Sequence, residues 1–225
     1  HMGALPYVLK RWPDAKVCSC AKAASVFSRQ GALDMIVSMG QTAAEFYEKD
    51  PAEVTAEGIR VDIVLEDNET IDLGGGETLT AYETKGHTDC SMSYFLEPVG
   101  LMFASESTGV LEAPDRLHGS VLKSFEQTLA AARRLKELDI KHLLIPHFGL
   151  TTDETRERFF DWYIEEALTE KALIEDCLAR GLTEEEVFEE HKKIYWNDVR
   201  ALYHPYRAYK MNTEIIIKMV AANMQ

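Results

Sequence analysis

The segment DLGGGETLTAYETKGHT, residues 72–88, is the most informative stretch of the chain for its fold. It opens with a turn of three glycines at 74–76, continues as a strand-like stretch over residues 78–82, and ends in Gly86-His87-Thr88. Glycine allows a tight backbone path out of a strand, so the loop that follows can direct the His87 imidazole at a cation. The segment therefore predicts a β-hairpin that delivers a histidine to a loop beyond the end of a strand.

Two further polar signals also follow strand-like apolar runs. Ser105-Glu106 comes after Met102-Phe103-Ala104, and Pro146-His147-Phe148-Gly149 comes after His142-Leu143-Leu144-Ile145. Two imidazoles and a carboxylate on loops beyond strand ends can converge on one divalent cation. His87, Glu106 and His147 are therefore the candidate metal ligands and catalytic residues.

Composition narrows the class of protein. The chain has 225 residues, 46% of them hydrophobic, which is ample for a sizeable core, and its net charge of -14 repels nucleic acids and anionic membranes. No run approaches the roughly 20 apolar residues of a membrane span. We expect a cytoplasmic protein with a small-molecule substrate and no nucleic-acid or membrane partner.

The four cysteines are scattered, and Cys90, three residues after His87, is expected to be an inert thiol rather than a ligand.

Periodicity predicts helices and strands in a mixed order. Antiparallel strands are expected between residues 60 and 104, starting with residues 61–65, and a polar loop is expected between residues 105 and 120. Helices are expected over residues 5–11, over residues 21–49 with breaks near Gly31 and Gly40, and over residues 121–139. Three more are expected, one from Thr152 or Asp153 to Gly181, one that starts at a capping box of Thr183 and Glu186, and one over residues 205–224. Short strands are expected over residues 15–18 and 142–145.

The chain is expected to divide near Thr151. Residues 1–150 form a mixed β/α core in this interpretation, and residues 151–225 form an all-helical extension that acts as a lid or a dimerisation element. Within the extension, Tyr203, His204 and Arg207 are candidate substrate contacts, although packing against a neighbouring core is the stronger alternative for this segment. We assign no role to His118, His142 and His191, whose surroundings are typical of the surface or of helix ends.

These motifs resemble those of the metallo-β-lactamase superfamily, the αββα metallohydrolase fold shared by glyoxalase II and lactonases. Residues 72–82 look like its glycine-turn hairpin and 85–88 like its Pro-Gly-His-Thr metal loop, with Lys85 in place of proline. Residues 102–106 resemble its strand ending in Gly-Asp, and 145–149 its terminal Gly-His-Gly loop. The likeness covers residues 3–150 and implies an α/β sandwich of this type with a C-terminal helical extension.

The resemblance also implies roles. His87 would bind one metal, His147 a second, and Glu106 would stand for the aspartate that bridges the two, although its longer side chain leaves open whether it bridges, binds one metal or points away. The implied cofactor is Zn²⁺, as one or two ions, with iron or manganese as alternatives. Catalysis would use a metal-activated water on a small ester, thioester, lactone or phosphoester.

One part of the family pattern is missing from the chain. No His-x-His-x-Asp-His run occurs, and residues 3–17 look like the stretch that directly follows it, so His1 would stand where the last histidine of that run stands, whether it is native or comes from a tag. The sequence thus resembles a family member cut at its metal motif. A sheet edge left uncovered would favour a homodimer or a complementing chain.

Two other functions remain open from the sequence. Loss of most ligands favours a metal-poor scaffold or interaction module without catalysis. A redox protein like the flavodiiron proteins, which use the same fold with iron, is the second alternative, although Gly86-His87-Thr88 favours the hydrolases.

Overall fold

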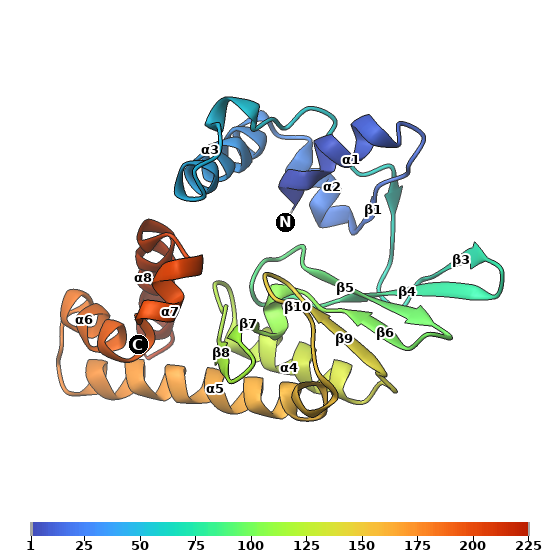
Figure 1. The fold of residues 1–225 in the computed structure, drawn as a ribbon. Coiled ribbons are helices and arrows are strands. Elements are labelled where there is room, and N and C mark those ends of the chain that lie inside the picture. Colours follow the sequence, from blue (N-terminus) through green and yellow to red (C-terminus); the bar gives the residue numbers. More distant parts are fainter. Residues whose placement is uncertain (1, 225) are drawn as a thin grey trace. The chain divides into compact units, whose positions relative to one another are not determined.

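The structure, a computed structural model, describes residues 2–224 and divides into two compact units after Asp67 (Figure 1). The first unit ends at Asp67 and the second begins at Asn68. The boundary expected near Thr151 lies inside the second unit, and the division into a core of residues 1–150 and an extension of residues 151–225 stays a prediction.

The first unit is mostly helical. Its elements are η1 (Met2–Ala4), α1 (Leu5–Arg11), β1 (Cys18–Ser19), α2 (Ala21–Phe27), α3 (Gln30–Phe46), η2 (Pro51–Glu53) and β2 (Ile63–Val64). The prediction of a helix over residues 5–11 is confirmed. The expectation that residues 61–65 join the antiparallel strands is wrong, because β2 pairs in parallel with β1. The Asp62 carboxylate holds this pairing by accepting a hydrogen bond from the Val17 amide at 2.9 Å.

The prediction of helix breaks near Gly31 and Gly40 is wrong. The break between α2 and α3 falls at Ser28 and Arg29, and α3 runs through both glycines. A Cβ at position 40 would lie 2.8 Å from Val54 Cγ1. Gly40 is therefore explained by close packing against the segment after η2, which periodicity along one helix does not reveal.

The second unit carries a six-stranded sheet and a layer of helices. Its elements are β3 (Thr70–Gly74), β4 (Glu77–Glu83), β5 (Met92–Glu97), β6 (Leu101–Phe103), η3 (Glu106–Thr108), β7 (Val110–Ala113), β8 (Arg116–His118), α4 (Phe125–Lys136), β9 (His142–Ile145), β10 (Gly149–Leu150), α5 (Asp153–Ala179), α6 (Glu184–Tyr195), α7 (Asp198–Tyr203) and α8 (Tyr206–Asn223).

The direction of the strands explains where the candidate ligands emerge. The sheet has the order β10-β9-β6-β5-β4-β3. Strand β5 is antiparallel to both β4 and β6, and β6 is parallel to β9. Strands β4, β6 and β9 consequently run in the same direction, and the loops that follow them leave the sheet at the same edge. Those loops carry His87, Glu106 and His147.

A second hairpin lies where the sequence predicted a polar loop. Strands β7 and β8 pair antiparallel, with Val110 opposite His118 and Leu111 opposite Leu117. Both leucines are buried. The turn between the strands contains Pro114 and Asp115, which are typical turn residues. The two strands are short and their register shifts, so their alternation is a weak signal in the sequence.

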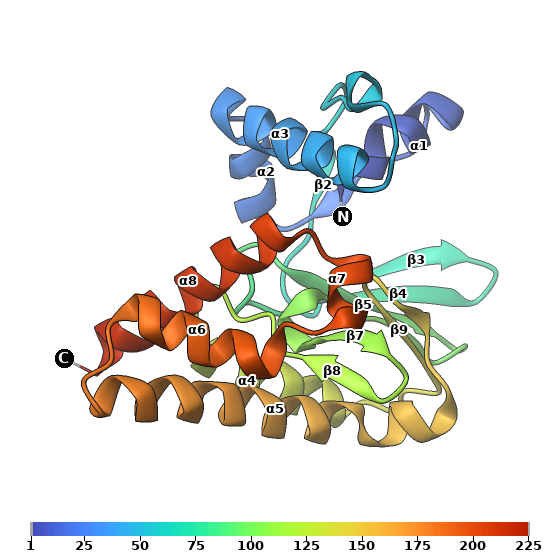
Figure 2. The same cartoon turned by 60° about the vertical axis from the view of Figure 1, so that its left-hand side comes forward.

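The core lies between the sheet and the helices. Helix α4 buries the expected apolar stripe, including Leu129, Ala132 and Leu135, and α5 packs against α4, α6 and α8 (Figure 2). Thr152 caps α5 by accepting a hydrogen bond from the Thr155 amide, and the capping box of Thr183 and Glu186 opens α6, as predicted.

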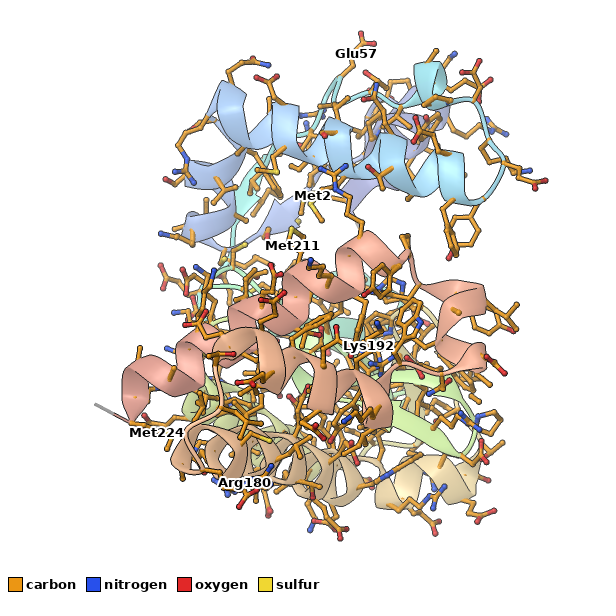
Figure 3. All side chains as sticks on the ribbon, turned by 90° about the vertical axis from the view of Figure 1, so that its left-hand side faces the viewer. Met2, Glu57, Arg180, Lys192, Met211 and Met224 are labelled. Atoms are coloured by element: carbon orange, nitrogen blue, oxygen red, sulfur yellow. The ribbon has the colours of Figure 1, made fainter. Side chains whose placement is uncertain are left out.

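The helical layer presents both charged and apolar side chains to the outside. Figure 3 shows Arg180 at the C-terminal end of α5, Lys192 on α6 and Met211 on α8. Lys192 Nζ lies 5.5 Å from the centre of the Tyr206 ring. Within residues 2–224, no helix is both long enough and apolar enough to cross a bilayer.

Candidate metal centre

The carboxylate of Glu106 connects the two candidate histidines. Its Oε2 lies 2.7 Å from His87 Nε2, and its Oε1 lies 2.7 Å from His147 Nε2. The three side chains come from three loops at one edge of the sheet, 19 and 41 residues apart along the chain. The structure therefore brings together the three residues that the sequence singled out. Their roles as metal ligands and catalytic residues stay predictions.

Ser120 fixes the orientation of the His87 ring. His87 Nδ1 lies 2.7 Å from the Ser120 carbonyl oxygen and 2.9 Å from its hydroxyl oxygen. A carbonyl oxygen only accepts hydrogen bonds, so Nδ1 carries the hydrogen and Nε2 is the nitrogen directed at Glu106. Histidines that bind metals are commonly held in this way, with one nitrogen donating to a backbone carbonyl.

Hydroxyl groups tie the loops together beneath the site. The buried Thr84 Oγ1 lies 3.0 Å from Ser93 Oγ and 2.9 Å from Ser105 Oγ, which links the ends of β4, β5 and β6. Ser107 Oγ accepts a hydrogen bond from the His87 amide at 3.0 Å. The positions of His87 and Glu106 are thus coupled through short side chains with few rotamers.

A close backbone approach holds the His87 loop against helix α4. Gly86 has φ of 135°, and a Cβ there would lie 2.5 Å from Thr128 Cβ. The buried Thr128 hydroxyl contacts the Ser107 carbonyl and lies 2.7 Å from the Tyr163 hydroxyl on α5. Burial raises the pKa of Tyr163 well above its usual value, so this hydroxyl keeps its proton. Glycine is therefore required at position 86 for both conformation and space.

The other end of the site is more open. The side chain of His147 is 58% exposed, whereas those of His87 and Glu106 are 16% and 13% exposed. His147 also has a positive φ of 65°, a conformation that costs free energy in residues other than glycine. The strained backbone turns its imidazole back toward Glu106, and the open side faces solvent from which a small molecule can approach.

The residue set fits a metal ion in its chemistry. Two imidazole nitrogens and one carboxylate match the ligands of Zn²⁺, and the contact of His87 with Ser120 matches the support that such ligands receive. In the arrangement seen, the Glu106 carboxylate contacts both imidazoles directly. Within residues 2–224, no group of three or more His, Cys, Asp or Glu side chains is spaced to hold a metal ion.

Of the other predicted site residues, one lies outside the described part of the chain and the rest lie around the junction of α7 and α8. His1 is not among residues 2–224, so its predicted role as a ligand is not addressed. Cys90 Sγ lies 3.5 Å from the Thr88 hydroxyl. Tyr203 and Arg207 are exposed, and their role as substrate contacts stays a prediction.

His204 is the member of its segment with the most distinctive surroundings. Burial lowers its pKa to about 4, and the electrostatic effects of His118, Arg200 and His147 act in the same direction, against that of Glu112. The influence of His147 means that His204 is within electrostatic range of the metal candidates. Its role as a substrate contact stays a prediction.

Two histidines that the sequence assigned to the surface or to helix ends, without a role, have buried polar partners. His191 is buried, with Nε2 2.9 Å from Glu170 Oε1 and Nδ1 2.9 Å from the Tyr209 hydroxyl. Most of the His118 side chain is covered, and burial lowers its pKa. Both were missed because their partners come from other elements. His142 is exposed, as expected.

A buried ion pair was also missed. Arg200 on α7 contacts the Glu112 carboxylate on β7, and both side chains are buried. Burial opposes ionisation of Glu112, but the polar contact with His118 and the charge of Arg200 outweigh it and lower the pKa of the carboxyl. No local sequence motif predicts an ion pair between residues that are 88 positions apart in the chain.

Solved structures share the arrangement of this chain. A metallo-beta-lactamase superfamily protein from Sulfolobus tokodaii matches with 21% identity and a TM-score of 0.58, over 73% of this chain and 62% of its own. A metallo-beta-lactamase family protein from Thermus thermophilus matches with 16% identity and a TM-score of 0.61, over 99% of this chain and 72% of its own. The chain has a metallo-β-lactamase fold. It spans less than two thirds of the length of the Sulfolobus protein.

A looser structural likeness connects the chain to a flavo di-iron protein. A flavo di-iron protein from Thermotoga maritima matches with 19% identity and a TM-score of 0.47, over 74% of this chain and 41% of its own, too loose a likeness to support an argument. No protein-family model matches the sequence. No curated protein matches it either. The mixed α/β class with C-terminal helices, expected from the sequence, is confirmed.

Proposed function

We propose that this protein is a metal-dependent hydrolase of a small ester, thioester, lactone or phosphoester. The observation that carries the proposal is the single carboxylate, Glu106, held between the imidazoles of His87 and His147. Zn²⁺ is the cofactor we favour, as one or two ions, because nitrogen and carboxylate ligands suit it. When bound, such an ion would act as a Lewis acid and would lower the pKa of a water molecule that it binds to near neutrality.

The residues of the chain have distinct parts in this proposal. His87 binds through Nε2 because Ser120 engages Nδ1. Glu106 supplies negative charge to a cation and, when not coordinating, accepts a proton from a neighbouring group. His147, the most exposed of the three, is the residue closest to solvent and to an incoming substrate. His204 is the candidate for orienting that substrate.

Metal content and hydrolysis, measured together, test this proposal. The purified protein is equilibrated with zinc, dialysed, and analysed for bound metal and for hydrolysis of an aryl ester and an aryl phosphodiester. His87→Ala, Glu106→Gln and His147→Ala are expected to lower both metal content and rate by at least roughly tenfold. His142→Ala is the matched control, because His142 is exposed at the opposite end of β9 from His147. Equal residual activity in the wild type and all variants would end the proposal.

A scaffold without catalysis is the second candidate. It is favoured by the direct contacts of Glu106 with both imidazoles and by the lack, within the described part of the chain, of three ligands spaced for a metal ion. Absence of bound metal at saturating zinc would support it. Iron in place of zinc, seen by elemental analysis and visible absorption, would instead support a redox protein.

We also propose self-association or pairing with a complementing chain. Met35 and Met39 on α3 are exposed, and none of the residues of α3, all of which the structure describes, is fully buried. Exposed apolar surface of this kind favours association. A monomer mass by light scattering across the micromolar range would contradict this proposal.

A further inference from the structure

The second unit contains a small cavity lined by side chains with unmet hydrogen-bonding capacity. Within residues 2–224, three buried side-chain atoms lack a partner in hydrogen-bond geometry, namely His118 Nδ1, Thr151 Oγ1 and Glu170 Oε2. The first of them does have a polar contact, 3.2 Å from Glu112 Oε1. Both His118 and Glu170 line one cavity of about 30 Å³. Buried polar atoms without partners are rare in folded proteins, and two around one cavity indicate a bound polar group.

Glu170 is the anionic wall of the cavity. It lies near the middle of α5 and is only 3% exposed. Its Oε1 lies 2.9 Å from His191 Nε2, while Oε2 has no partner. A buried carboxylate oxygen without a donor carries a large desolvation cost. A ligand that donates hydrogen bonds to Oε2 would remove that cost.

The neighbouring cations do not neutralise Glu170 directly. The guanidinium of Arg200 contacts the Glu112 carboxylate instead. Burial lowers the pKa values of His118 and His204, which leaves both rings neutral at pH 7. One neutral tautomer of His191 satisfies both of its contacts, donating from Nε2 to Glu170 and accepting at Nδ1 from Tyr209. With His191 neutral or charged, Glu170 Oε2 has no hydrogen-bond partner within residues 2–224.

The shape of the cavity limits what can enter it. A volume of about 30 Å³ corresponds to roughly two water positions. A Cβ on Gly119 would lie 2.7 Å from Glu170 Oε2, so the glycine keeps the approach to this oxygen open. The described residues offer no group of three His, Cys, Asp or Glu side chains spaced for a metal ion, in this cavity or elsewhere.

The surrounding elements place this cavity behind the metal candidates. Residues of β8, α5, α6, α7 and α8 contribute to its walls, and Figure 2 shows these helices gathered against one another. Ser120 also lines it, and the carbonyl of the same residue engages His87 Nδ1. The cavity therefore adjoins the His87 ring on its Nδ1 side, and His204 is also part of its lining.

We propose that this cavity binds an ammonium group, either as the free ion or as the end of a small primary amine, with Glu170 Oε2 as its principal acceptor. The ammonium group supplies positive charge and several N–H donors within the volume of one water molecule. The proposal does not rest on the metallohydrolase function, because binding is measured without turnover.

Thermal unfolding of the protein as purified tests the site. Ammonium chloride and methylammonium chloride are compared with sodium chloride at equal ionic strength. We expect a saturable rise in Tm of roughly 2–4 °C once the bound cation exceeds its Kd about fivefold. A rise with ammonium alone identifies the free ion as the ligand, and a rise with both cations identifies the ammonium end of an amine. Tetramethylammonium, which has no N–H donor, is expected to give no rise.

Variants connect the shift in Tm to the cavity. Glu170→Gln keeps the shape of the side chain and is expected to abolish the rise, whereas Glu165→Gln, at an exposed position of the same helix, is expected to retain it. Gly119→Ala is a second blocking variant if Glu170→Gln does not fold, and calorimetric titration of the wild type with methylammonium gives a direct reading. Equal Tm values in ammonium and sodium chloride, an equal rise with tetramethylammonium, or a rise retained in Glu170→Gln would overturn the proposal.

Discussion

His87 Nδ1 contacts Ser120 twice, at 2.7 Å from its carbonyl oxygen and 2.9 Å from its hydroxyl oxygen. The loop that follows β8 therefore decides which nitrogen of His87 is available beside Glu106. The carbonyl contact survives any side-chain substitution at position 120, so a variant there reports on the hydroxyl contact alone.

Ser120→Ala is expected to weaken zinc binding by about three- to tenfold, at the lower end of the range for residues that support metal ligands, because the carbonyl contact remains. Competition with a chromophoric chelator measures the affinity. Ser38→Ala on the exposed face of α3 is the control. Unchanged affinity would mean that the carbonyl oxygen alone orients the ring.

Gly86→Ala is expected to destabilise the protein by about 3 kcal/mol or more, because the new Cβ meets the backbone of α4 and the residue must keep a positive φ. Gly75→Ala is a matched control with φ of 66° and no neighbouring atom within 4 Å, for which we expect about 1 kcal/mol. Urea unfolding gives both values. Equal losses would show that conformation alone, and not the contact with Thr128, requires the glycine.

Thr128 and Tyr163 are expected to be energetically coupled. Thr128→Val leaves the Tyr163 hydroxyl and the Ser107 carbonyl without a buried partner, which costs about 1–3 kcal/mol of unfolding free energy. Tyr163→Phe removes one partner, and the double variant is expected to lose less than the sum of the single losses. A double-mutant cycle in urea measures the coupling. Strict additivity would indicate that the 2.7 Å contact between the two hydroxyl groups contributes nothing.

His204 is expected to make stability depend on pH between about 6.5 and 4. Its pKa is about 4 in the folded protein and near its usual 6.5 in the unfolded chain, so the unfolded chain binds more protons in this window. Stability from His204 is fully present above pH 6.5 and is lost as pH falls toward 4. His204→Gln is expected to flatten the profile of Tm against pH there, with exposed His142→Gln as control. An unchanged slope would place the titration elsewhere.

Local chemistry made much of the second unit predictable. The glycine turn at 74–76 and the alternation after it identify β4, the stripe containing Leu129 and Leu135 identifies α4, and the Thr183 capping box identifies the start of α6. Each signal depends on neighbouring residues along the chain. Turn, amphipathicity and capping preferences act over a few residues, so they can be read before the fold is known.

The buried polar pairs could not be predicted in this way. Glu170 meets His191 and Arg200 meets Glu112 only because α5, α6, α7 and β7 pack together. A charged residue in a helix is expected on the surface unless its partner is known, and the partners here are 21 and 88 residues away. The same reason explains why no buried partner was expected for His118 and His191, which were assigned to the surface or to helix ends.

The order of amino acids was enough to identify which residues end the strands that matter, since Gly86-His87, Ser105-Glu106 and Pro146-His147 each follow an apolar run. The folded chain was needed to learn that Glu106 stands between the two imidazoles and that Ser120 sets the orientation of one of them. The difference arises because strand order and direction, which place three distant loops at one sheet edge, are fixed by pairing between segments far apart in the chain.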